Sequence, residues 1–388
     1  MRTRKNKGYK IPKYDRIFDS SSHRKRIKTR NTIIFILVLA VLVFVGYSIA
    51  GPLSNLLKGE KTELPSSSSQ ISSQNENASS QVSSEEKLPE IDSLSCAYLP
   101  LETAKDADKL ADFLDTIKSR GYNAAVLELK DEVGKIYFDS KNEIALEVSA
   151  VSDTAVLNLS EIVKAIKDSS VTPIAQIHAF KDRIATKKAD AKIKYKGNAD
   201  WSWLDAENGK PWLNPYSSVA KKYITDIAIE LTDIGFENIM VSSVMFPPVY
   251  SYSLADFGEG EKSVSHKDAL ASFTSSLKKA LNDKKANLIL NYDASFAKDP
   301  ENKVYGTADA MNFDADLYCA DITADYLKSV EDKENLTTEI KLATFLKSFG
   351  EGKKVMINLH ADSKENADTL KELCKEYSYY LSSKTQIF

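Results

Sequence analysis

Acidic side chains stand at the ends of several short apolar runs in this 388-residue chain. Glu128 and Asp131 close one run, and Asp293 and Asp321 follow two others. Paired carboxyl groups can divide general acid and base work, because different surroundings separate their proton affinities. We therefore take these four residues as candidate catalytic groups. Acids at such positions also serve as caps and solvated groups, so each has a structural alternative.

Further polar and aromatic residues lie near the same run ends and form a candidate set of ligand contacts. They are Lys130, His178, Asp182, Trp203, Trp212, Asn214, Ser242, Tyr292 and His360. For His178 and His360, a hydrogen-bonded structural histidine is the alternative to a site residue.

The three tryptophans of the chain fall within one 12-residue stretch, Trp201 to Trp212. Aromatic rings beside amide groups are typical of sugar-binding surfaces, where rings stack on sugar faces and amides bond to hydroxyls. The alternative is that these rings pack their loop against the rest of the domain.

Metal and nucleotide chemistry have little support in the sequence. The chain has only 4 histidines and no HExxH-type spacing, and its 14 glycines form neither GxGxxG nor GxxxxGK[ST]. These are the patterns that catalytic zinc and phosphate-binding loops require. We therefore expect no metal and no cofactor.

The elements that must position these residues alternate between strand and helix. Apolar runs predict strands at 95–100, 123–129, 172–178, 238–244, 287–292, 315–320, 354–359 and 385–388. Helical spacing is visible from Ala107 to Ile117 after a capping pair Thr103 and Asp106, and across 219–234, 270–281 and 367–381. Eight strands with intervening helices favour an α/β fold, a (β/α)₈ TIM-like barrel, whose chemistry lies at the carboxyl ends of the strands.

The N-terminal part predicts membrane attachment. Residues 32–50 carry no charge, and residues 1–31 form a basic tail with 12 Lys or Arg against Asp15 and Asp19. About 20 apolar residues cross a bilayer, and the basic flank stays in the cytoplasm. We expect a signal-anchor helix that leaves the rest of the chain outside the membrane. Cleavage by a signal peptidase after Ala50 is the alternative.

Residues 51–93 are rich in Ser, Gln, Asn and Glu and predict a disordered linker before a domain at 94–388. The net charge of the whole chain is −3, so the acidic part beyond the basic tail is not suited to nucleic acid. Three cysteines, Cys96, Cys319 and Cys374, do not make a disulfide framework, and buried thiols are favoured.

Four phrases in order resemble one family: NAAVLELKDEVGKIYFDS, PIAQIHAFKDRIA, WLDAENGKPWLNPY and GFENIMVSSVMFPP. They are similar to the glycoside hydrolase-like TIM-barrel domain of bacterial exported and surface proteins, distantly akin to the α-amylase clan. The matches include Asn123 to Asp131, the phrase Phe180, Lys181 and Asp182, and the phrase Trp212 to Tyr216. The resemblance implies a barrel that acts on or binds carbohydrate.

The fourth predicted strand departs from that family. There the resemblance implies an inner Asp and a following Arg, where this chain has Ser242 and Met245. The Gln before them is Met240 here, and an Arg of the third strand is Gln176. Glycosidases need two carboxyl groups, about 5 to 5.5 Å apart for retention or about 6.5 to 9.5 Å for inversion. A serine without an adjacent base is a poor replacement.

Two hypotheses follow. The favoured one is a membrane-tethered pseudoenzyme that binds a polysaccharide or cell-wall glycan, or serves as a cell-envelope module, because the carboxylate and the two cations are absent together. The alternative is an active glycoside hydrolase that uses a relocated pair, such as Glu128 or Asp131 with Asp293 or Asp321.

Overall fold

The computed structural model describes residues 88–322, except 90, 92, 206–207, 250, 298–302 and 307–309, together with 354–360, 368, 372 and 378–382. The predicted tail (1–31), membrane segment (32–50) and nearly all of the predicted linker (51–93) lie outside these residues, as does Cys374. Within the described residues, no helix has the length and apolar character needed to cross a membrane.

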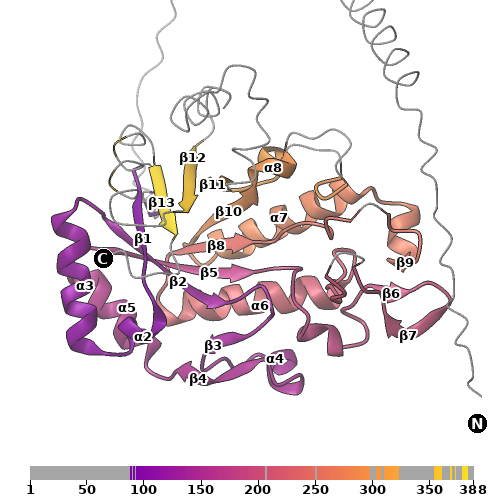
Figure 1. The fold of residues 1–388 in the computed structure, drawn as a ribbon, viewed down its shortest axis with the longest axis horizontal. Coiled ribbons are helices and arrows are strands. Elements are labelled where there is room, and N and C mark those ends of the chain that lie inside the picture. Colours follow the sequence, from indigo (N-terminus) through magenta and orange to yellow (C-terminus); the bar gives the residue numbers. More distant parts are fainter. Residues whose placement is uncertain are drawn as a thin grey trace, which may run out of the picture. The chain divides into compact units, whose positions relative to one another are not determined.

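Eight parallel strands close into a barrel, which confirms the predicted fold (Figure 1). The ring closes because β1 pairs in parallel with both β2 and β13. In chain order the strands are β1 (Ser95–Tyr98), β2 (Ala124–Lys130), β5 (Thr172–His178), β8 (Asn238–Ser242), β10 (Asn287–Asp293), β11 (Leu317–Ile322), β12 (Val355–His360) and β13 (Ser378–Ser382).

Seven of these strands lie where apolar runs predicted them, and the eighth does not. The barrel closes through β13, whereas the predicted strand at 385–388 lies outside the described residues. The predicted helix across 367–381 is therefore wrong at its end, since Leu381 pairs with Leu359 of β12 and Ala97 of β1. Leu381 fits a helical face in sequence, but its neighbours Tyr379 and Tyr380 suit a strand equally well.

Amphipathic helices cover the outside of the barrel. α3 (Ala107–Ser119), α5 (Leu159–Asp168), α6 (Ser218–Ile234) and α7 (His266–Asn282) each bury an apolar face. α6 packs against β8, the strand that follows it in the chain. The capping pair predicted for α3 is corrected in one respect: Asp106 is the N-cap and accepts from the amide of Lys109, whereas Thr103 belongs to the preceding short helix α2 (Leu101–Ala104).

Several short strands and helices are added to the barrel and its outer helices. After β2 the chain forms β3 (Ile136–Phe138), α4 (Glu143–Glu147) and β4 (Val151–Val156); the two strands β3 and β4 extend the sheet at β2. A separate three-stranded sheet consists of β6 (Lys194–Tyr195), β7 (Asn198–Ser202) and β9 (Ala255–Asp256). The remaining elements are α8 (Ala294–Ala297) and the 3₁₀ turns η1 (Ala185–Lys187), η2 (Glu259–Lys262) and η3 (Ala310–Asn312).

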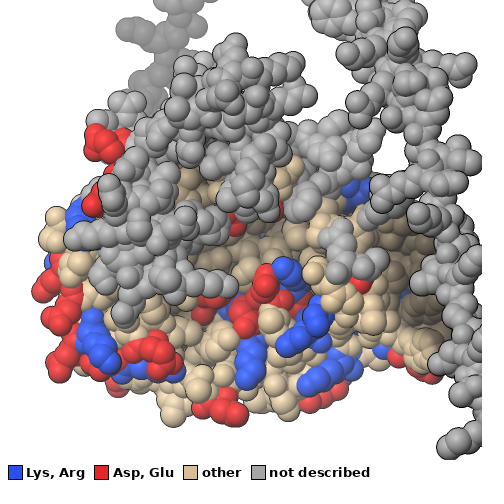
Figure 2. Space-filling model, in the orientation of Figure 1, with Lys and Arg blue, Asp and Glu red and all other residues tan. Residues whose placement is uncertain are grey.

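Two apolar layers stabilise the barrel. The larger lies between the strands and the helices, and the smaller fills the interior with residues such as Cys96, Ile174, Met240 and Met356. Cys96 and Cys319 are buried free thiols, and burial raises the pKa of both. On the described part of the face in Figure 2, acidic and basic side chains lie interspersed.

Candidate functional site

A cavity of about 300 Å³ opens at the carboxyl ends of the strands. We call it the mouth cavity. Every barrel strand contributes to its wall, through Tyr98, Glu128, Gln176, His178, Ser242, Asn291, Asp293, Asp321, Asn358 and Tyr380. The loops add Glu132, Lys181, Ser243, Met245 and Tyr305, and Tyr292 of β10 also lines it.

The strand sequences explain why this end of the interior is polar. Side chains two residues apart share a face, so each apolar residue of the interior has a successor one layer higher. Ile174, Met240 and Ile289 fill the interior. Their successors Gln176, Ser242 and Asn291 line the cavity. One alternation therefore produces both the apolar interior and the polar mouth.

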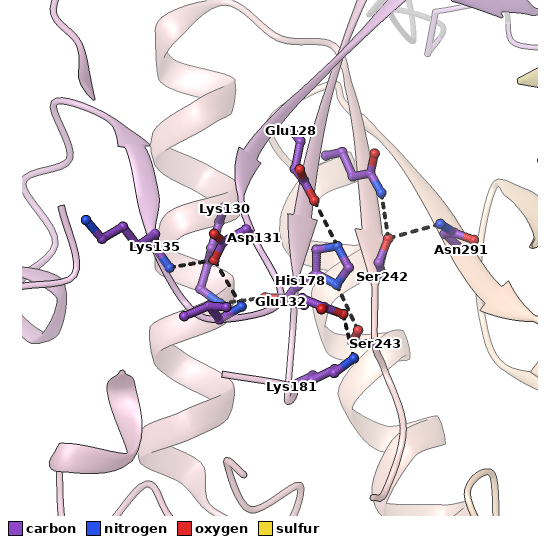
Figure 3. Close-up of polar contacts among 12 residues, drawn as sticks. Glu128, Lys130, Asp131, Glu132, Lys135, His178, Lys181, Ser242, Ser243 and Asn291 are labelled. Carbon is purple, nitrogen blue, oxygen red and sulfur yellow. Dashed lines mark hydrogen bonds and ion pairs between the residues drawn. The ribbon is translucent and has the colours of Figure 1, made fainter. Parts of the chain in front are cut away.

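Ser242 lines the cavity and lies beside Asn291 (Figure 3); we call Ser242, Gln176 and Asn291 the cavity floor. Ser242 is buried, and its hydroxyl oxygen accepts hydrogen bonds from Gln176 Nε2 and Asn291 Nδ2, both at 3.1 Å. Asn291 Oδ1 is buried and accepts no hydrogen bond from the described residues. A buried carbonyl without a donor costs free energy, and a ligand hydroxyl that enters the cavity can supply one.

Glu128, His178 and Ser243 form a chain of contacts at one side of the cavity (Figure 3). Glu128 Oε1 lies 3.3 Å from His178 Nε2, and His178 Nδ1 lies 2.8 Å from Ser243 Oγ. The three residues come from β2, β5 and the residue after β8, which are neighbours in the barrel. The sequence does not indicate Ser243 as a site residue, because the pairing of β5 with β8 is not visible in it.

Asp293 and Asp321 line another part of the same cavity. They are direct partners in the pairing of β10 with β11. Asp293 Oδ1 accepts from the amide and hydroxyl of Ser295, at 2.8 and 2.5 Å. Burial raises the pKa of Tyr305 beside them, and the charges of both aspartates add to the rise. Burial likewise raises the pKa of Tyr98 to about 12, with the charge of Glu128 as a second cause.

Asp131 is placed in a turn and is not among the described residues that line the mouth cavity. Its Oδ1 accepts from the amides of Val133 and Lys135, and Tyr137 donates to its Oδ2 at 2.8 Å. The carboxylate therefore organises the turn between β2 and β3. Of the two residues predicted as alternative partners of Asp293 or Asp321, Glu128 lines the mouth cavity with them and Asp131 is not among its described lining residues.

Lys130 and Asp182 were predicted as ligand contacts, but they form an ion pair with both side chains fully buried, Nζ to Oδ2 2.8 Å. The cause is a bulge in β2: Glu128 pairs with Gln176, but Lys130 pairs with Ile177. The extra residue turns Lys130 to the outer face of the barrel. There its ammonium group lies 5.7 Å from the ring of Tyr223.

Trp203, Trp212 and Asn214, which the sequence suggests as ligand contacts, lie in the interior of their loop. Trp203 and Trp212 are buried in the larger apolar layer, and Trp212 Nε1 donates to Asp205 at 2.8 Å. Neither ring is among the described residues of the mouth cavity. Asn214 is buried too, with Nδ2 donating to the carbonyl of Phe257 and Oδ1 accepting from the amide of Tyr216. These residues hold their loop in place, so the packing alternative describes them.

His360 ends β12, where its backbone pairs with Ser382, and its side chain lies outside the described part. In the described ranges, no cluster of His, Cys, Asp and Glu side chains could hold a metal ion.

Comparisons with known proteins agree with this architecture. A family model described as "Putative glycosyl hydrolase domain" matches residues 96–305. No curated protein matches the chain. Among solved structures, the chain is similar to the glycoside hydrolase domain of PgaB (BpsB) from Bordetella bronchiseptica. The identity is 12%, the match covers 77% of this chain and 95% of that one, and the TM-score is 0.57.

A hypothetical protein from Ruminiclostridium thermocellum is 23% identical over 47% of this chain and 91% of its own, with a TM-score of 0.42. The likeness to the PgaB domain shows a shared fold alone. The family match spans more than half of the 388 residues, so the chain belongs to this glycosyl hydrolase domain family.

Proposed function

We propose that the mouth cavity binds a carbohydrate and that the barrel is a glycan-binding module of the cell envelope rather than a glycosidase of its family's usual design. The observation that carries this proposal is the neutral floor, in which Ser242 accepts from the amides of Gln176 and Asn291. Neutral amides and hydroxyls beside aromatic rings match the alternating hydroxyls and apolar faces of a sugar.

The floor also argues against cleavage by the fourth barrel strand. Ser242 stands where the family resemblance implies a carboxylate, and both contacts that its oxygen makes come from amide donors. Neither amide can accept the hydroxyl proton as a general base, so Ser242 cannot replace a carboxylate as nucleophile. Its suitable role is to exchange hydrogen bonds with ligand hydroxyls.

A glycan array probed with the full-length chain tests this proposal. Asn291→Ala removes the buried carbonyl and one donor of the floor, and we expect about tenfold weaker binding of any glycan that the wild type retains, because about one hydrogen bond is lost. The matched control is Asn198→Ala, in the separate β6–β7–β9 sheet. Equal loss in both variants, or no glycan bound by the wild type, would contradict the proposal.

Glycosidic hydrolysis is the second candidate, because Glu128, Asp293 and Asp321 line one cavity. Asp293 and Asp321 lie on adjacent strands, which run about 4.8 Å apart, near the spacing of a retaining pair. Glu128 and Asp321 lie on β2 and β11, on opposite sides of the ring. Release of reducing sugar from a glycan panel, lost in Asp321→Asn, would favour this candidate over binding alone.

Membrane tethering is part of the proposal and is supported by the sequence alone. The uncharged segment 32–50 after a basic tail would anchor the chain, and residues 51–93 would hold the barrel away from the bilayer. Protease added to intact cells should remove the barrel and leave a short N-terminal fragment in the membrane. Protection of the barrel in intact cells, with digestion only after lysis, would contradict this topology.

A further inference from the structure

Ser243 differs from the other residues of the described chain that combine a side chain with a left-handed backbone. Four non-glycine residues have positive φ: Ser149, Ser170, Ser243 and Lys285. Three of them follow α4, α5 and α7, where such a residue commonly ends a helix. Ser243, with φ 56°, instead follows a barrel strand and lines the mouth cavity. Strain at a strand end beside a cavity is a feature of functional sites.

The backbone around Ser243 is fixed against the end of β5. The amide of Ala179 donates to the carbonyl of Ser242 at 2.8 Å, and that of Phe180 donates to the carbonyl of Ser243 at 3.1 Å. Buried Lys130 donates to the carbonyl of His178 at 2.7 Å. Both the hydroxyl and the imidazole are therefore attached to a rigid edge of the barrel, so their contact is preorganised.

His178 lies between a carboxylate and a serine hydroxyl, which is the arrangement that activates a serine. With hydrogen on Nε2, the ring turns this nitrogen toward Glu128, with Oε1 3.3 Å away in a charge contact, and presents the Nδ1 lone pair to the hydroxyl of Ser243, 2.8 Å away. A nucleophile within hydrogen-bond reach of a base, itself oriented by a carboxylate, is the arrangement of serine hydrolases. The side chains of His178 and Glu128 are 15% and 23% exposed, so a substrate in the cavity can reach them.

We propose that Ser243, His178 and Glu128 form an acyl-transfer centre that hydrolyses O-acyl esters carried by a glycan in the mouth cavity. The glycan part of this assignment rests on the proposed function. The ester chemistry rests on the three side chains alone.

The reaction balances as an ordinary ester hydrolysis. His178 takes the hydroxyl proton while Ser243 Oγ bonds to the carbonyl carbon, and the imidazolium then returns this proton to the departing sugar oxygen. A water molecule next gives a proton to His178 while its oxygen bonds to the acyl carbon. The bond from that carbon to Ser243 Oγ then breaks, His178 returns the proton to Oγ, and the acyl group leaves as a carboxylic acid. The amide of Val244 donates no hydrogen bond to the described residues and can serve the developing oxyanion.

The test uses the purified full-length chain and two small probes, p-nitrophenyl acetate and a fluorophosphonate that labels activated serines. We expect hydrolysis of the ester, and mass spectrometry should locate the label on Ser243. Ser243→Gly suits the positive φ, so it should fold and lose at least about 100-fold in kcat/KM together with the label. His178→Gln should lose both as well.

Ser170→Gly is the matched control, since it makes the same change at φ 63° after α5 and should hydrolyse the ester like the wild type. A label on another residue, or equal hydrolysis by Ser243→Gly and the wild type, would overturn the proposal. Acetylated xylo-oligosaccharides then test the substrate class: acetate release that depends on Ser243 supports a glycan ester. If Ser243 cleaves only the simple ester, the glycan assignment is overturned. If the protein binds no glycan, the proposed function fails, but hydrolysis of p-nitrophenyl acetate and labelling of Ser243 should still occur.

Discussion

Replacing Lys130 by methionine should destabilise the protein more than any change to its surface ion pairs. Lys130 and Asp182 form a fully buried ion pair, with Nζ and Oδ2 2.8 Å apart and both side chains 0% exposed. Methionine keeps the apolar stem but removes the charge. It leaves the carboxylate of Asp182 buried, where Oδ1 still accepts from the amide of Ala185 at 2.7 Å.

The expected cost follows from that isolated charge. Removing one partner of a buried ion pair typically costs about 3 to 5 kcal/mol, because the remaining charge stays desolvated. We expect Lys130→Met to lower the free energy of unfolding by about this amount. Adding Asp182→Asn should recover much of the loss, because a neutral amide oxygen can still accept from Ala185 without a buried charge.

Urea unfolding followed by tryptophan fluorescence measures this cost, since Trp203 and Trp212 are buried. Lys181→Met is the control: Lys181 pairs with Glu132, and the two side chains are 40% and 50% exposed. Such pairs are worth about 0.2 to 1 kcal/mol. If Lys130→Met cost no more than Lys181→Met, or if Asp182→Asn made the loss worse, the assignment of Lys130 and Asp182 to a structural pair would fail.

Two further predictions concern a glycine and a histidine. Gly134→Ala places a Cβ 1.9 Å from Asp182 Oδ1 at φ 98°, so it should destabilise by more than about 2 kcal/mol in thermal unfolding. Gly197→Ala, at φ 95° with open space around it, should cost only about 1 kcal/mol, and equal costs would contradict the steric reason. Burial lowers the pKa of His266, which stacks on Phe246, so the unfolded chain binds a proton more readily and the free energy of unfolding should fall as pH drops below about 6.5. His266→Phe should remove that part of the pH dependence, and an unchanged pH profile would refute it.

The sequence predicts the barrel because each strand is a short apolar run followed by a turn or a helical segment. It misplaces the last strand because SYYLS, at 378–382, alternates too weakly to be separated from a helical face through Leu381. Pairing with β1 and β12 decides the matter, and neither contact is local in sequence.

The site divides in a similar way. Glu128, His178, Asp293 and Asp321 could be placed at one mouth, because parallel strands bring their carboxyl ends together. Lys130 could not, because the bulge that reverses its direction depends on how β2 pairs with β5.

The sequence around a tryptophan does not show whether its ring is buried in the core or stacks on a sugar. Trp203 and Trp212 therefore fit both interpretations. Ser243 gave no local signal either. Its importance appears only when the pairing of β5 with β8 sets His178 beside it.

A crystal structure of the full-length chain with an oligosaccharide selected on the glycan array is the decisive test of carbohydrate binding in the mouth cavity. We expect a sugar in the mouth cavity, with a hydroxyl within hydrogen-bond distance of Asn291 Oδ1 and another beside Ser242. A sugar bound on the exposed ring of Trp201, with none in the mouth cavity, would contradict this binding site.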